Sequence, residues 1–219
     1  MNSQLTPKRS ASSTTDPPAL VLVANERQPP GRRLARPGAN VLYPISVCDF
    51  ILTASSLQLL ARPIASAEIL DEAQRNITAN RPDLEPSRIE RRFNAVRAAT
   101  DGHDQPVARR FADNSIINTK DRHVLAAALH HEVNYIITND AGLRAEITAW
   151  LDHRPRHHKL IAAITPNQLT AALIDNSPDE VVAVVTAMAT RLRNPTRTVR
   201  EVVAAISNNL PAITAINLA

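Results

Sequence analysis

The middle of the chain alternates between short apolar runs and segments with helical apolar spacing. Residues 135–138 and 160–164 are short apolar runs of the kind that predict strands. Helices are expected around them, at residues 49–60, from residue 67 onward behind Ser66 as its cap, at 86–100 and at 121–131. Pro63 is expected to stop the first of these helices. Strands that alternate with helices are typical of α/β proteins, so the pattern predicts a parallel sheet flanked by helices.

The N-terminal stretch has a different composition. Residues 1–37 are dense in Ser, Thr, Pro and Arg, which favours a solvated, disordered tail over a packed element. Residues 19–24 are the exception, because their apolar character predicts a short buried strand that could pair with the sheet. We therefore expect a tail over residues 1–37 and a main domain over residues 38–164.

The C-terminal part, residues 165–219, is expected to form a helical extension of this domain. Three of its segments show helical apolar spacing. Their candidate capping residues are Thr165, Ser177 and either Thr196 or Thr198. This extension is expected to pack on the sheet or on a partner.

Composition narrows the class of partner and the cellular setting. The formal net charge of +4 makes an anionic partner plausible, with nucleic acid ahead of a membrane surface. Cys48 is the only cysteine, so an intramolecular disulfide is impossible and a reducing, cytoplasmic setting fits. With four glycines and no Gly-rich phosphate loop, a nucleotide cofactor is not expected.

Four acidic or amide side chains stand at positions where a parallel sheet gathers its functional groups. Asn40 follows the first expected core strand, Glu72 lies on a helix, Asp121 opens another helix and Asp140 follows the strand at residues 135–138. Strand carboxyl ends and helix N-termini converge on one crevice in an open parallel sheet. Clustered carboxylates facing one crevice favour a hard cation such as Mg²⁺ or Mn²⁺, which suggests phosphodiester hydrolysis. Taken alone, each of these acids is more readily explained as a solvated surface residue, and Asp121 could serve only as a helix cap.

Four segments in order resemble the PIN-domain family, which includes the VapC-type toxin ribonucleases of bacterial toxin–antitoxin pairs. They are residues 39–44 (ANVLYP), 66–72 (SAEILDE), 121–128 (DRHVLAAA) and 136–140 (IITND). The resemblance reaches Ile164, and its most specific part is residues 121–128. It implies a PIN-like α/β fold with a metal-dependent endoribonuclease site.

The resemblance also implies roles for single residues. Glu72, Asp121 and Asp140 would hold Mg²⁺ or Mn²⁺ and carry out catalysis, while Asn40 and Thr138 would support the site. The chain departs from the family pattern at Gly38, where the first metal-binding aspartate is expected. Either a ligand has been lost and metal binding is weakened, or another acid substitutes, with Glu26 as one candidate.

Three functional hypotheses follow. The first is a PIN-type endoribonuclease that cuts RNA as the toxin of a toxin–antitoxin pair. The second is a degenerate PIN domain that binds RNA or a protein partner without cutting. The third places the functional surface on the helical extension, where an antitoxin-like helix or a second copy of the chain would dock.

Overall fold

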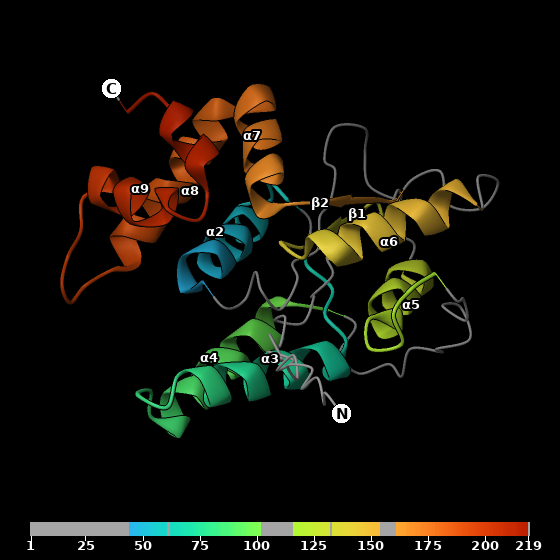
Figure 1. Ribbon diagram of the computed structural model, residues 1–219. Helices are drawn as coiled ribbons and strands as arrows, with labels where there is room; N and C mark the ends of the chain where they lie inside the picture. Colours follow the sequence, from blue (N-terminus) through green and yellow to red (C-terminus); the bar gives the residue numbers. More distant parts are fainter. Residues whose placement is uncertain (1–43, 61, 102–115, 132, 154–160, 219) are drawn as a thin grey trace, which may run out of the picture.

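The computed structural model describes residues 44–60, 62–101, 116–131, 133–153 and 161–218. These residues form a mixed α/β fold that is mostly helical (Figure 1). The helices are α2 (Ile45–Ser56), α3 (Ala67–Asn80), α4 (Pro86–Ala99), α5 (Arg122–His130), α6 (Ala141–Asp152), α7 (Pro166–Asn176), α8 (Pro178–Arg191), α9 (Val199–Ser207) and the 3₁₀ helix η2 (Pro211–Ala215). The expectations for residues 1–37, Gly38 and Asn40 lie outside the described residues.

Strands β1 (Tyr135–Ile137) and β2 (Ala162–Ile164) form a parallel pair, with Tyr135 opposite Ala162 and Ile137 opposite Ile164. Helix α6 is part of the connection between them, as in a β–α–β unit. Both strands are shorter than the apolar runs that predicted them, but the parallel arrangement is confirmed. Ile136 and Ile137 are both fully buried, which is the pattern of a strand covered on both faces.

Local capping chemistry explains where several helices begin. Ser66 Oγ accepts a hydrogen bond from Ile69 N at 3.4 Å at the start of α3. Thr165 and Thr198 each form a capping box with the side chain three residues later, at the starts of α7 and α9. Ser177 is the N-cap residue of α8, as expected, but its side chain makes no capping hydrogen bond, and Pro178 occupies the first helical position.

The end of α2 also differs from the sequence-based expectation. The helix covers residues 45–56 rather than 49–60, and it ends before Pro63 is reached. Gln58 adopts a left-handed conformation with φ of 62°, and Leu59 N donates to Ala54 O at 2.9 Å. This is the hydrogen-bonding pattern of a left-handed helix C-terminus, so local backbone geometry and not the proline terminates α2.

Two hydrophobic clusters form the core, and β1 lies between them. The first cluster joins α3, α4, α5 and α6 and takes in Ile136. The second joins α2, α8, α9 and η2 and takes in Ile137. Successive residues of a strand point to opposite faces, so the two isoleucines serve one cluster each.

The helical extension therefore packs against the rest of the chain. Helices α8 and α9 contact α2, and Figure 1 shows the orange and red C-terminal helices beside the blue α2. The expected domain boundary at residue 165 lies within the second cluster and stays a prediction. None of the helices in the described ranges combines the length and apolar character needed to cross a membrane.

Candidate functional site

Asp121 lies directly before α5, but its side chain does not cap that helix. Its backbone provides the turn, because Asp121 N donates to Asn118 O at 2.9 Å and Val124 N donates to Asp121 O at 3.0 Å. The carboxylate makes no capping hydrogen bond with the first turn of α5. The capping interpretation therefore does not explain why an acid stands at this position.

The carboxylate of Asp121 is buried and poorly compensated. The residue is only 4% exposed, and burial raises its pKa to about 6. Lys120 and His123 oppose this shift, while the negative charges of Asp140 and Glu146 add to it. The one ion pair that the described residues offer it is with Lys120, whose Nζ lies 4.0 Å from Asp121 Oδ2. A negative charge is thus held out of water beside two other acids.

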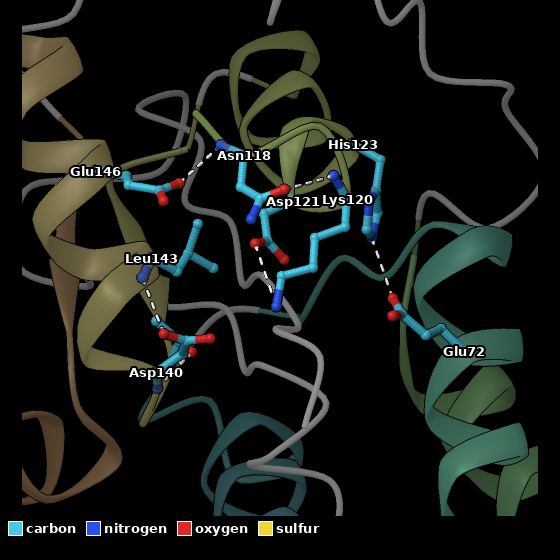
Figure 2. Close-up of polar contacts among 9 residues, drawn as sticks. Glu72, Asn118, Lys120, Asp121, His123, Asp140, Leu143 and Glu146 are labelled. Atoms are coloured by element: carbon cyan, nitrogen blue, oxygen red, sulfur yellow. Dashed lines mark hydrogen bonds and ion pairs between the residues drawn. The ribbon is translucent and has the colours of Figure 1, made fainter. Parts of the chain in front are cut away.

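Asp140 is held in place at the start of α6, on the same side of Asp121 as Glu146 (Figure 2). Its Oδ1 accepts a hydrogen bond from Leu143 N at 2.9 Å and so caps α6. Its own N–H donates to the hydroxyl of the fully buried Thr138 at 3.1 Å. Thr138 therefore holds the backbone of Asp140 in place, and its supporting role in a site stays a prediction.

Gly142 gives the Asp140 carboxylate the space that it occupies. A Cβ atom on Gly142 would lie 3.2 Å from Asp140 Oδ1, closer than ordinary van der Waals contact. A side chain here would push against the oxygen that caps α6. The glycine thus belongs to the local structure that positions Asp140.

Glu146 belongs to the acidic group but was missed by the sequence analysis. It lies on α6, and its Oε2 accepts a hydrogen bond from the backbone N–H of Asn118 at 2.8 Å. This contact ties α6 to the loop that leads into Asp121 (Figure 2). The sequence does show that Glu146 follows Asp140 by six residues in a helical segment. Nothing in the sequence indicates that Asn118 contacts Glu146.

Glu72 lies on the other side of Asp121, on α3 (Figure 2). Its Oε2 is 3.5 Å from Nε2 of His123, an ion pair when the imidazole is protonated. Both residues line an open hollow of about 390 Å³, together with Glu68, Asp71, Arg75 and Lys120. Glu72 is not among the charges that shift the pKa of Asp121, so the structure brings Asp121 and Asp140 together and leaves Glu72 apart.

The types of side chain at this site suit a hard divalent cation, but their arrangement does not form a complete binding site. Carboxylate oxygens are the ligands that Mg²⁺ and Mn²⁺ prefer, and among the described residues the buried Asp121 has Lys120, at 4.0 Å, as its one ion-pair partner. Within the described ranges, however, no three His, Cys, Asp or Glu side chains are gathered into a group that could hold a metal. Asp121 and Asp140 are the carboxylates here that could contribute to such a site.

Comparison with known proteins bears on the C-terminal part of the chain. Residues 166–216 match the family model of the VapC50 C-terminal domain, a stretch that runs from the first residue of α7 to just beyond η2. No curated protein and no solved structure was found to match the chain. The match covers less than a quarter of the sequence, and at a coarse level it supports a component of a VapC-type toxin–antitoxin system.

Proposed function

We propose that this protein is a Mg²⁺- or Mn²⁺-dependent endoribonuclease that acts as the toxin of a toxin–antitoxin pair. The observation that carries the proposal is the buried Asp121, whose pKa is raised to about 6 and whose neighbours include Asp140 and Glu146. Such an arrangement is costly unless a cation offsets the charge, and it is typical of functional sites. The resemblance of residues 121–128 and the C-terminal match to the VapC50 family support the same function.

Asp121 and Asp140 would hold the cation, with Glu146 next to them and Glu72 able to contribute only after leaving His123. A bound divalent cation would supply Lewis-acid polarisation of the phosphate and a more acidic water. Its positive charge would favour the ionised form of Asp121, which the metal-free protein disfavours. Lys120 is exposed and lies 4.0 Å from Asp121, so its ammonium group could pair with a phosphate oxygen instead.

RNA is the expected substrate because the family that the chain resembles cuts RNA, and the net charge of +4 is compatible with a polyanion. A toxin that cuts cellular RNA would act in the cytoplasm and would require a cognate antitoxin as its partner. Self-association as a homodimer belongs to the same proposal. Light scattering of the full chain alone would measure homodimer formation. The same measurement on the chain co-expressed with a candidate antitoxin would measure complex formation.

The test compares two aspartate variants in a cleavage assay with fluorescent RNAs and Mn²⁺. Asp121→Asn removes the buried carboxylate, and we expect cleavage to fall by more than about 100-fold, since even loss of an outer partner of a metal ligand costs up to that much. Asp175→Asn, a matched change at an exposed aspartate on α7, is expected to leave cleavage unchanged. Calorimetric titration with Mn²⁺ should show the same difference in binding.

An inactive native chain would contradict the nuclease proposal, as would equal cleavage by the native chain and Asp121→Asn. The second of these results would assign the activity to a contaminant or to another site. Mn²⁺ binding that persists unchanged in Asp121→Asn would place the cation elsewhere.

A degenerate PIN domain that binds RNA or protein without cutting is the second candidate. Two observations favour it: glycine stands at position 38 where the resemblance calls for an acid, and the described residues hold no ready group of three metal ligands. Gly38→Asp discriminates between the candidates. New cleavage by this variant, with no cleavage by the native chain, would support the degenerate form, whereas a native chain that already cuts RNA would contradict it.

A further inference from the structure

All the basic residues of the helical extension lie in one short segment. Within residues 165–219 they are arginines that fall between residues 191 and 200, which we call the arginine segment: Arg191, Arg193, Arg197 and Arg200. Three of the four acids of the extension lie near the other end of α8: Asp175, Asp179 and Glu180. The two kinds of charge are thus separated along α8, whose 14 residues span about 21 Å.

The helix dipole explains only part of this separation. Arg191 lies in the last turn of α8 and two acids lie in its first turn, which is the arrangement that the dipole favours. Arg193 and Arg197 lie in the connection between α8 and α9, outside both helices. Arg200 lies in the first turn of α9, where the dipole disfavours a positive charge. Helix stability therefore accounts for Arg191 and not for the other three arginines.

Contacts with other parts of the chain give two of the arginines a structural role. Arg191 donates a hydrogen bond to Asp49 Oδ1 at 3.3 Å and so connects α8 to α2. Arg200 donates to the backbone oxygen of Leu218 at 3.1 Å and so holds the end of the chain against α9. Neither contact explains why Arg193 and Arg197 are present.

Arg193 and Arg197 lie close together and carry no such contact. An isolated bridge between Arg193 and Thr196 closes the chain into a tight turn, which brings the backbones of the two arginines near each other. Within the described ranges, no hydrogen bond or ion pair engages either guanidinium group. The nearby acid, Glu201, already accepts two hydrogen bonds from Thr198, and these lower its pKa first, with the charge of Arg197 adding to the effect.

The turn is also open to a large partner. Every residue from 190 to 198 is exposed. Figure 1 shows the connection between α8 and α9 at the edge of the molecule, on the side away from α5. Two like charges at one exposed turn repel each other, and a bound anion would offset that repulsion.

We propose that the arginine segment binds the phosphate backbone of RNA, with Arg193 and Arg197 as the contacting residues. A guanidinium group presents its N–H donors in a planar fork that matches the oxygens of a phosphate. The choice of RNA rests on the proposed function, and the inference adds a binding surface that is separate from the Asp121 site. RNA held there would be contacted away from the bond that is cut.

The composition of the segment favours RNA over the other anionic partners. Among the large hydrophobic residues, Leu192 is the exposed one in the segment, at 41%, which is too little apolar surface for insertion into a lipid headgroup layer. A protein interface would need an apolar centre depleted of charge, and the segment offers none. Residues 165–219 contain no aromatic residue on which a base could stack, so binding should depend on phosphates and not on base sequence.

The test measures binding of a fluorescently labelled single-stranded RNA to the full chain by fluorescence anisotropy. A chelator is present so that the RNA stays intact, and the salt concentration is varied from about 50 to 200 mM. For the native chain, the logarithm of the association constant should fall linearly with the logarithm of the salt concentration. The double variant Arg193→Gln/Arg197→Gln should bind more weakly, with a slope that is smaller by about 1.4, because each lost phosphate contact on a single strand removes about 0.7.

The matched control is Arg88→Gln/Arg91→Gln, which removes the same charge from two exposed arginines of α4. Its slope should equal that of the native chain. Circular dichroism of both double variants should match the native spectrum, because all four side chains are exposed.

A native chain that does not bind RNA would overturn the proposal, as would an unchanged slope in Arg193→Gln/Arg197→Gln. An equal decrease of the slope in the α4 control would also overturn it, because binding would then follow net charge alone. Phosphatidylserine vesicles and polyglutamate serve as the other anions. A double variant that loses binding to either of these while still binding RNA as the native chain does would assign the segment to a lipid or a protein instead.

Failure of this proposal and failure of the proposed nuclease are distinguishable. The binding measurement needs neither metal nor cleavage, whereas the nuclease is judged by cleavage with Mn²⁺ and by Asp121→Asn. A chain that cuts RNA but whose binding is unaffected by the arginine variants would keep the nuclease and remove the surface proposed here.

Discussion

At the residue scale, the candidate site shows that an acid at a helix start need not be a cap. Asp121 and Asp140 both precede helices, and only Asp140 uses its carboxylate to accept a hydrogen bond from the first turn. The Asp121 carboxylate is instead buried near Asp140 and Glu146, where its charge is disfavoured. Tertiary packing therefore gives two residues with the same local position different chemistry.

The raised pKa of Asp121 predicts how the stability of the metal-free protein depends on pH. The folded-state pKa of about 6 lies above the ordinary value of 3.8, so folding favours the protonated form. Stability should fall as pH rises from about 4 to 6 and should then stay reduced by up to about 3 kcal/mol. Asp121→Asn should remove this dependence, leaving the variant more stable than the native chain at pH 7 and closer to it at pH 4.

Urea unfolding followed by circular dichroism across this pH range, in the presence of a chelator, measures the effect. Asp175→Asn is the matched control, because that side chain is exposed and its replacement should change the free energy of unfolding by less than about 0.5 kcal/mol. A difference between native chain and Asp121→Asn that stays constant from pH 4 to pH 7 would contradict the burial argument.

At the element scale, short-range signals located most helix starts. Thr198 accepts a hydrogen bond from Glu201 N at 3.2 Å, and Glu201 Oε2 accepts one from Thr198 N at 2.7 Å. The hydrogen bond from Thr198 N, together with a second from the Thr198 hydroxyl to Glu201 Oε2 at 2.9 Å, lowers the pKa of Glu201. The capping box is therefore weakened when the pH falls and the carboxylate is protonated. Sequence spacing identifies such boxes because both partners lie within one turn.

Thr198→Ala should lower the free energy of unfolding by about 1 kcal/mol, since it removes the cap of α9. Thr186→Ala is the control in the middle of α8, where the hydroxyl only bonds back to Val182 O at 2.8 Å and alanine is a better helix former. The control should be neutral or slightly stabilising in the same denaturant titration. An equal loss in both variants would mean that the capping box contributes nothing specific.

At the scale of the whole molecule, β1 joins two hydrophobic clusters that draw on distant parts of the chain. Phe50 on α2 is fully buried in the second cluster with α8, while Trp150 on α6 is buried in the first. Because Ile136 and Ile137 belong to different clusters, loss of one cluster should weaken the other through the sheet. The clusters are expected to unfold together.

Phe50→Ala tests this cooperativity. We expect a loss of about 3–5 kcal/mol, as is usual for truncating a buried phenylalanine. Fluorescence of Trp150, the only tryptophan, should report the same destabilisation as circular dichroism even though it lies in the other cluster. Ile45→Ala, at a residue on α2 that is 56% exposed, is the control and should have little effect. An unchanged tryptophan transition in Phe50→Ala would show that the clusters unfold separately.

The sequence by itself determined the elements whose signals are local. Apolar runs placed β1 and β2, and capping residues such as Ser66 and Thr165 placed helix starts, because these interactions span at most one turn or one strand. Alternation of strands and helices determined that the sheet is parallel. The same alternation predicted that Asp121 and Asp140 lie near one edge of the sheet, since strand ends and helix starts meet there.

Only the tertiary structure decided what depends on packing between distant segments. It brought Glu146 against Asn118, paired Glu72 with His123 and buried Asp121 with Lys120 as its one ion-pair partner among the described residues. It also packed the helical extension on α2, from the other end of the described chain. No periodicity encodes these contacts, because each one depends on how two surfaces far apart in the sequence fit together once the hydrophobic clusters have formed.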